Sequence, residues 1–219
     1  GTGAVTVSTL ADITGAAATK QKSVSIATAN TATSVSLSGL EDGTYSVYAV
    51  DAAGNLSAAS GTTYVVDSTV PTVTSVTLTS ATGAQNNTLN VGDMITATVV
   101  FSEAVVVTGA PQLGLTIGSS VVQAVYASGS NSNTLTFTYT IAAGQTDANG
   151  IAVAANALGL NGGTIKDTAG NAAVLTHAAV ADNASYMVDT TAPTAGLTAG
   201  ISANTGSASV QSSEVGTAY

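Results

Sequence analysis

The acidic side chains are the only ionisable groups in this sequence that are numerous enough to build a chemical site. The chain has 12 Asp and Glu residues against 3 basic residues, all of them lysine, and a single histidine. Three carboxylates held close together repel one another unless a cation lies between them. Ca²⁺ suits such a group, because it takes about six to eight oxygen ligands from carboxylates and carbonyls. A calcium site therefore requires a fold that brings together acids that are distant in sequence.

Two acidic segments occur twice along the chain. Residues 51–55 (DAAGN) return as residues 167–171 (DTAGN). Residues 64–71 (YVVDSTVP) return as residues 186–193 (YMVDTTAP). The proline that ends the second segment has no N–H and a fixed φ, so it ends strand pairing and stiffens a connection. The repeats therefore indicate domain boundaries at the two Asp-to-Pro segments.

These boundaries predict three parts of unequal completeness. Residues 68–190 form one complete domain. Residues 1–67 form the C-terminal part of a domain, and residues 191–219 form the N-terminal part of the next domain, which is of the same type as 1–67. Neither flanking part has enough strands to cover both faces of a sheet. We interpret the sequence as one period of a tandem array of repeats.

Short runs that alternate apolar residues with serine or threonine predict β-strands at about 72–79, 94–101 and 134–141. A period of two places the apolar residues on one face of each strand. Clusters of Gly, Asn, Ser and Asp separate the runs, and no long segment has a helical period. The predicted fold class is all-β, with tandem Ig-like antiparallel β-sandwiches. The expected core of the complete domain includes Val99, Phe101, Leu135, Phe137 and Tyr139.

This topology predicts where the acids of the complete domain meet. The first strand leaves the boundary at Asp67 and the second strand returns to it, which places Glu103 beside the boundary. The penultimate strand runs to the same end and brings the turn from Asp167 to Asn171. We expect these residues to bind Ca²⁺. The alternative is that each acid is a solvated loop residue that caps a turn.

The second boundary is expected to repeat this arrangement. Asp189 corresponds to Asp67. Glu214 corresponds to Glu103, because Ser213-Glu214 is similar to the Ser102-Glu103 pair. The turn residues Asp51 and Asn55 then come from the next copy of the repeat. The predicted partners of this chain are accordingly neighbouring copies of the same repeat, arranged head to tail.

Asp147 and Asn149 form a further, weaker candidate for metal binding. They place alternating oxygen donors before Gly150, as a short calcium loop does. The segment lacks the downstream glutamate that completes an EF-hand loop. An Asx turn is the alternative, and it is the interpretation that we favour.

Composition excludes several classes of function. The net charge of −9 and the absence of arginine argue against nucleic-acid binding and against attraction to an acidic membrane surface. No apolar run reaches the ~20 residues that cross a bilayer, so no membrane insertion is expected. The chain has no cysteine for disulfides or thiolate chemistry, and His177 has no second histidine to help form a metal site. We therefore predict that the protein is not an enzyme.

Several segments together resemble the bacterial Ig-like tandem repeats of giant RTX-type and biofilm surface adhesins and related cell-surface proteins. The resemblance implies an extracellular or cell-surface location, a structural role as a stalk, and calcium at domain junctions. It names no adhesive ligand. The segments that carry it are residues 90–93 (NVGD), 101–105 (FSEAV), 107–111 (VTGAP), 147–151 (DANGI), 167–171 (DTAGN) and 189–193 (DTTAP).

Two classes of function follow from these expectations, and both share the fold. In the first, the chain is a calcium-stiffened segment of an adhesin stalk or filament, with repeats joined in one very long polypeptide. In the second, it is a self-assembling fibre, surface-layer or matrix subunit, whose partial domains are completed by strand exchange between chains. A third and weaker possibility is direct ligand binding through the sandwich loops.

Overall fold

The computed structural model describes residues 7–197 and 209–216, and in these ranges the chain is almost entirely β. The predicted all-β class is therefore confirmed. One five-residue helix, α1, is present, and no helix in these ranges is long and apolar enough to span a membrane. The elements are α1 (Leu10–Thr14), β1 (Gly43–Ser46), β2 (Thr63–Val66), β3 (Val73–Thr82), β4 (Thr88–Leu89), β5 (Met94–Thr108), β6 (Gln112–Ile117), β7 (Ser120–Ser128), β8 (Ser132–Thr140), β9 (Thr146–Asp147), β10 (Leu158–Gly159), β11 (Thr164–Lys166), β12 (Met187–Asp189), β13 (Ala195–Leu197) and β14 (Val210–Ser212).

The chain divides into two compact units. The first unit comprises Gly1–Pro71 together with Lys166–Ala173, and the second comprises Thr72–Ile165 together with Val174–Tyr219. The predicted three-part domain division is not tested by this result and stays a prediction.

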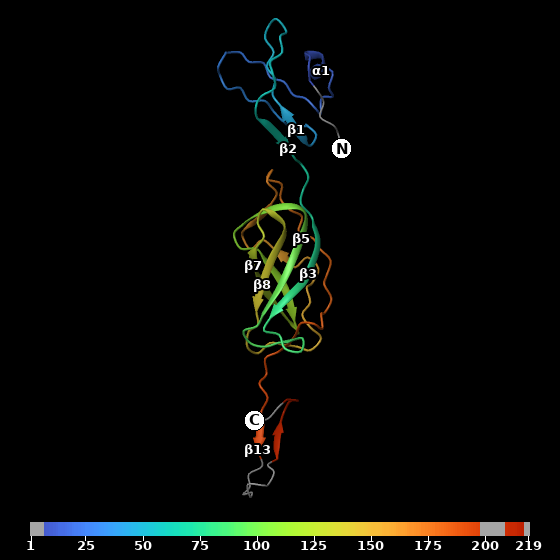
Figure 1. Ribbon diagram of the computed structural model, residues 1–219, viewed down its shortest axis with the longest axis vertical. Coiled ribbons are helices and arrows are strands. Elements are labelled where there is room, and N and C mark those ends of the chain that lie inside the picture. The colour runs from blue at the N-terminus through green and yellow to red at the C-terminus, as the bar shows by residue number, and fades with distance from the viewer. Residues whose placement is uncertain (1–6, 198–208, 217–219) are drawn as a thin grey trace. The chain divides into compact units, whose positions relative to one another are not determined.

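A seven-stranded sheet forms the centre of the second unit (Figure 1). Its strands follow the order β10-β6-β7-β8-β5-β11, and β3 also pairs with β5. A separate three-stranded sheet has the order β4-β12-β9. The pairings of β3 with β5, β5 with β8, β6 with β7 and β7 with β8 are all antiparallel, as the alternating sequence pattern predicted. The pair β4–β12 is parallel, which the sequence pattern did not predict.

The core of the second unit follows the period of two that the sequence shows. In β5, Ile95, Ala97, Val99 and Phe101 are buried on one face. Each of these residues pairs with a residue of β3 or β8, so three adjacent strands contribute to one apolar layer. Leu135 and Phe137 of β8 are also buried, as expected.

The prediction that Tyr139 lies in the core is wrong. Its side chain is only partly buried, and its hydroxyl accepts a hydrogen bond from Gln145 Nε2 at 3.0 Å. The phenolic oxygen needs a polar partner, and that partner is available at the edge of the core. The next inward-facing residue, Ile141, is the one that is buried.

Strand β5 is longer than the sequence pattern predicted. It continues past residue 101 to Thr108, but its register with β8 shifts between Val100 and Val105. Glu103 lies inside this irregular stretch rather than in a loop after the strand. A bulge re-aims side chains that regular alternation would place on the other face.

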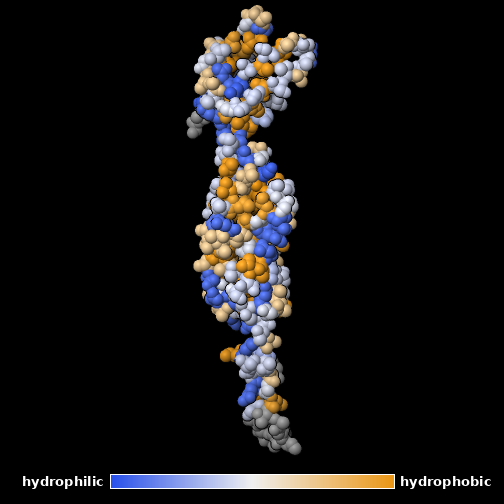
Figure 2. Space-filling view, turned by 180° about the vertical axis from the view of Figure 1, so that it is seen from behind, coloured by the Kyte–Doolittle hydropathy of each residue, from blue (hydrophilic) through white to orange (hydrophobic). Residues whose placement is uncertain are grey.

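The N-terminal segment has no comparable core. Among residues 7–70 no side chain is buried. The antiparallel β1–β2 pair leaves Tyr64 and Val65 57% and 62% exposed, and hydrophobic side chains are visible on the surface of this segment in Figure 2. The β13–β14 pair is similar, because Leu197 and Val210 are 66% and 57% exposed. Both hairpins therefore leave apolar side chains in contact with water.

Replacing Phe137 should reveal how much the second unit depends on its core. Its ring is fully buried and packs edge-on against Tyr126 at a centroid distance of 6.0 Å. Phe137→Ala should lower the free energy of unfolding by about 3–5 kcal/mol in urea denaturation, because it leaves a cavity. Val121→Ala is the control, since this side chain is 65% exposed, and it should change stability by less than about 0.5 kcal/mol. Equal effects of the two variants would contradict the assigned core.

Candidate metal site and linker contacts

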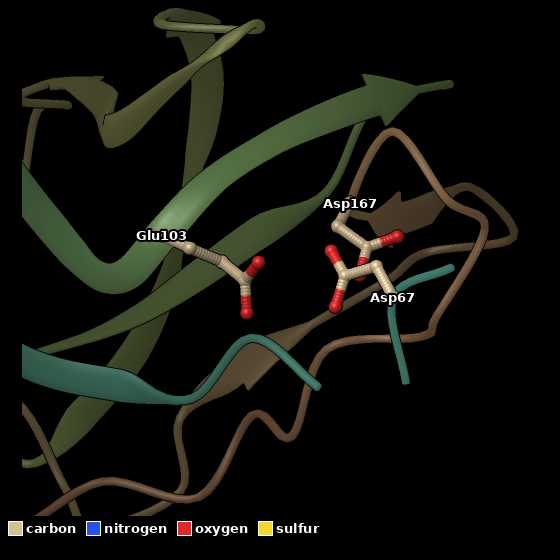
Figure 3. Close-up of side chains that lie close together, drawn as sticks. All are labelled: Asp67, Glu103 and Asp167. Atoms are coloured by element: carbon tan, nitrogen blue, oxygen red, sulfur yellow. The ribbon is translucent and has the colours of Figure 1, made fainter. Parts of the chain in front are cut away.

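Three carboxylates gather where the segment after β2, the middle of β5 and the turn after β11 meet. One oxygen from each of Asp67, Glu103 and Asp167 lies within 4.8 Å of the others. Figure 3 shows the carboxylates of Asp67 and Asp167 side by side, with Glu103 pointing towards them from β5. Asp167 is buried, and Asp67 and Glu103 are partly buried. No second group of three such side chains occurs within residues 7–197 and 209–216.

A tight turn fixes the position of Asp167. Its Oδ1 accepts hydrogen bonds from the N–H groups of Gly170 at 2.7 Å and Asn171 at 2.8 Å, and its Oδ2 accepts one from Asn171 Nδ2 at 2.8 Å. Gly170 has a φ of 101°, which an L side chain rarely adopts. Burial raises the pKa of Asp167, but the hydrogen bonds from Asn171 and Gly170 outweigh it and hold the pKa below its ordinary value. The carboxylate is therefore ionised at neutral pH.

The same turn holds residues 67–71, which we call the first linker. Asn171 Nδ2 donates hydrogen bonds to the backbone oxygens of Asp67 at 3.0 Å and Thr69 at 3.3 Å. Since Nδ2 is a donor, only the Oδ1 atom of Asn171 is suited to bind a metal. The observed role of this side chain is to hold the linker.

Asp42 holds the first linker through different atoms. Its Oδ1 accepts hydrogen bonds from the backbone N–H and the hydroxyl of Ser68, both at 2.7 Å, and its Oδ2 accepts one from the hydroxyl of Thr69 at 3.0 Å. The hydrogen bonds from Ser68 and Thr69 lower the pKa of Asp42. Sequence analysis missed this residue, because nothing local to residues 42–45 indicates a partner 26 residues later.

The turn from Asp51 to Asn55 has nearly the same geometry as the turn from Asp167. Asp51 Oδ1 accepts from the N–H of Asn55 at 2.8 Å, and Oδ2 accepts from Asn55 Nδ2 at 2.8 Å. Gly54 has a φ of 89°. The hydrogen bond from the Asn55 side chain is the main reason that the pKa of Asp51 is lowered. The sequence repeat therefore corresponds to a structural repeat.

Residues 189–193, which we call the second linker, also resemble the first linker. Asp189 Oδ1 accepts from the N–H of Thr191 at 2.9 Å, as Asp67 Oδ1 accepts from Thr69 at 3.0 Å. Asp189 is exposed, and its neighbour Thr190 bonds through its hydroxyl to the backbone of Gly144 and Gln145.

The residues that follow each linker match as well. The N–H of Thr72 donates to Ser102 Oγ at 3.0 Å, and the N–H of Thr194 donates to Ser213 Oγ at 2.9 Å. Glu214 therefore follows Ser213 in the same local setting in which Glu103 follows Ser102. Glu214 is exposed. Metal binding by Asp189, Glu214, Asp51 and Asn55 stays a prediction.

Asp147 and Asn149 form a turn whose polar groups are paired. Asp147 is 4% exposed; its Oδ2 accepts from the N–H of Gly118 at 2.8 Å, and its Oδ1 from those of Asn149 and Gly150 at 3.3 and 2.9 Å. The amide of Asn149 donates to the carboxylate of Asp182. These bonds are those of an Asx turn, the interpretation favoured from the sequence.

The donor set at Asp67, Glu103 and Asp167 fits a hard divalent cation. All the ligand atoms are oxygens, and no histidine or thiol takes part. Ca²⁺ tolerates irregular geometry and takes several carboxylates, whereas Mg²⁺ demands a near-ideal octahedron and retains waters. The three acids would supply part of a calcium shell, with water completing it.

Comparisons with protein-family models, with curated proteins and with solved structures gave no match. The resemblance to bacterial Ig-like repeats therefore stays a prediction.

Removing the amide of Asn171 should loosen the first linker. Asn171→Ala deletes hydrogen bonds to two linker carbonyls and to Asp167, at a cost of about 1–3 kcal/mol. Hydrogen exchange of the amides of residues 67–73 should become faster. Asn55→Ala is the matched control, since it removes the same turn bond without touching the first linker. Unchanged exchange in Asn171→Ala would contradict the assigned role.

Acid should release Asp42 from the first linker. A lowered pKa in the folded state means that the interaction is complete above the ordinary value of 3.8 and is lost as the pH falls through the lowered value. The NMR signals of the Ser68 and Thr69 amides should therefore titrate with a midpoint below 3.8. Asp42→Asn should abolish this titration. A midpoint at or above 3.8 would show that the hydrogen bonds do not stabilise the carboxylate.

Proposed function

We propose that this chain is a structural repeat of an extracellular bacterial surface adhesin, in which Ig-like sandwiches follow one another as a calcium-stiffened stalk. The observation that carries the proposal is the group formed by Asp67, Glu103 and Asp167 beside the first linker. Asp67 of the first linker, Glu103 of β5 and Asp167 of the turn would together bind one cation. Bound Ca²⁺ would supply the positive charge that offsets their mutual repulsion and would tie the linker to the sandwich that follows it.

The hydrogen bonds of the first linker support this proposal. Asp42 holds Ser68 from the N-terminal side, and Asn171 holds the carbonyls of Asp67 and Thr69. These bonds would help such a connection to resist bending even before a metal binds. A stalk needs stiff connections, because each flexible joint reduces the distance that the array spans.

The second linker supports a repeating arrangement. Its Asp189–Thr191 turn and its Thr194–Ser213 contact reproduce the features of the first linker. One chain therefore contains two linkers that share the same local turn and the same contact to a serine hydroxyl. Repetition of one junction along an array is typical of structural proteins built from tandem domains.

A self-assembling fibre, surface-layer or matrix subunit is the second candidate function. The exposed apolar side chains of the β1–β2 and β13–β14 pairs favour it, because unpaired strand edges and bare apolar faces invite pairing with another chain. In this version the flanking parts of two separate chains complete one sandwich. The stalk and the fibre share the same junction and differ only in covalent continuity.

Calcium should stabilise the folded chain through the three acids. A ligand at a hundredfold excess over its dissociation constant adds about 2.7 kcal/mol to stability. Thermal denaturation should therefore occur at a higher temperature with calcium than with chelator, and calorimetry should detect binding. Both effects should disappear at low pH, because protonated carboxylates do not bind the ion.

Two variants distinguish calcium binding at the three acids from a general effect of the chain's negative charge. Glu103→Gln should abolish the calcium-dependent gain in stability. Glu41→Gln removes a carboxylate that is 55% exposed and lies 3.8 Å from Lys20, so it should leave the gain intact. Identical denaturation curves with calcium and with chelator, together with no heat of binding, would overturn the proposal.

A further inference from the structure

The turn from Asp51 to Asn55 copies the turn from Asp167 but has no linker to hold. Asn171 Nδ2 donates to Asp167 Oδ2 and also to the carbonyls of Asp67 and Thr69. Asn55 Nδ2 donates to Asp51 Oδ2 at 2.8 Å, and within the described ranges it donates to no backbone carbonyl. Its side chain is exposed. The turn therefore presents, on an exposed residue, an amide donor with no backbone carbonyl partner in the described part of the chain.

The second linker is the counterpart of this turn. It has the Asp-to-Thr bond of the first linker, and it is followed by the same Thr-to-Ser contact. In the first linker, a side-chain amide donates to the carbonyls of the Asp and the Thr. In the described part of the chain, no side-chain amide donates to the carbonyls of Asp189 or Thr191. The contact between Asn171 and the first linker thus serves as a template. Its donor has a counterpart in Asn55 and its acceptors have counterparts in the carbonyls of Asp189 and Thr191, but within the described part of one chain these groups are not paired.

We infer that Asn55 of one copy binds the second linker of a neighbouring copy, with Nδ2 donating to the carbonyl oxygens of Asp189 and Thr191. The contact would place the Asp51 carboxylate next to Asp189 and Glu214, as Asp167 lies next to Asp67 and Glu103. The inference rests on the proposed head-to-tail arrangement and deepens it by naming the residues that recognise one another. The partner is a second copy of this repeat.

The exposed hairpins agree with this partner. β1 and β2 lie on either side of the Asp51–Asn55 turn, and β13 begins two residues after the second linker. Each hairpin leaves large apolar side chains exposed, among them Val65 and Leu197. A contact between Asn55 and the second linker would bring these hairpins towards each other across the interface. The same contact would therefore explain how the exposed apolar side chains of both hairpins become buried.

Cysteine cross-linking tests the contact in the full chain, which has no cysteine of its own. The double variant Ala53→Cys/Thr191→Cys keeps the Asn55 amide and places a cysteine on an exposed residue of the same turn. Treated with a short thiol-reactive cross-linker, it should give covalent dimers and longer ladders that increase with protein concentration. The template pair Ala169→Cys/Thr69→Cys, at the equivalent positions, should be bridged within one chain, with monomer mass plus one cross-linker. Circular dichroism checks that each variant retains its β structure.

The control pair is Asn133→Cys/Thr191→Cys, which moves the first cysteine to an exposed asparagine at the start of β8. It should remain monomeric under the same conditions. If the Ala53 pair also remains monomeric while the template pair is bridged, the inference is wrong. If the template pair itself is not bridged, the inference is overturned as well, because the template that it copies is absent.

The experiment also separates this inference from the proposed function. Ladders in both calcium and chelator would support the contact and would show that no metal is needed for it. Ladders only in calcium would support the contact together with the proposed metal-dependent junction. Absence of ladders combined with calcium-dependent stability of the monomer would overturn the inference and leave the proposed function standing.

Discussion

The close approach of the carboxylates of Asp67, Glu103 and Asp167 is the constraint on which the first junction depends. Hydrogen bonds within the turn hold the pKa of Asp167 below its ordinary value, so this acid does not avoid the repulsion by taking up a proton at neutral pH. The chain brings two further carboxylates to within 4.8 Å of it. A cation between ionised carboxylates would offset their repulsion, and the all-oxygen donor set suits calcium. The hydrogen bonds of Asn171 and Asp42 to the first linker hold the segment that carries Asp67.

The second unit and the flanking hairpins differ in how far they bury their apolar side chains. The seven-stranded sheet carries a closed apolar core, whereas residues 7–70 contain no buried side chain. The flanking hairpins nevertheless lie beside a turn and a linker that repeat those at Asp167–Asn171 and at residues 67–71. A domain whose parts come from two neighbouring copies would show such a turn and linker without a buried core in either part alone. This is why we connect the exposed apolar side chains with a neighbouring repeat rather than with a foreign ligand.

The sequence was informative where structure is local and periodic. Alternation identified the faces of β5 and β8, and the repeated DxAGN segments correctly indicated two equivalent turns. It failed where contacts between residues that are far apart in the sequence determine the structure. The hydrogen bond from Ser68 to Asp42, the parallel β4–β12 pair and the register shift around Glu103 all depend on residues far away in the chain. Tyr139 was misplaced because period alone does not reveal that its hydroxyl meets Gln145.

The most direct test of the central claim is the anomalous scattering from crystals grown with calcium. The account predicts an anomalous peak bounded by oxygens of Asp67, Glu103 and Asp167, at coordination distances of about 2.3–2.6 Å. Such a peak would locate the ion at the junction independently of any effect on stability. Crystals that show no peak there, with the three carboxylates turned apart or bonded only to water, would contradict the account.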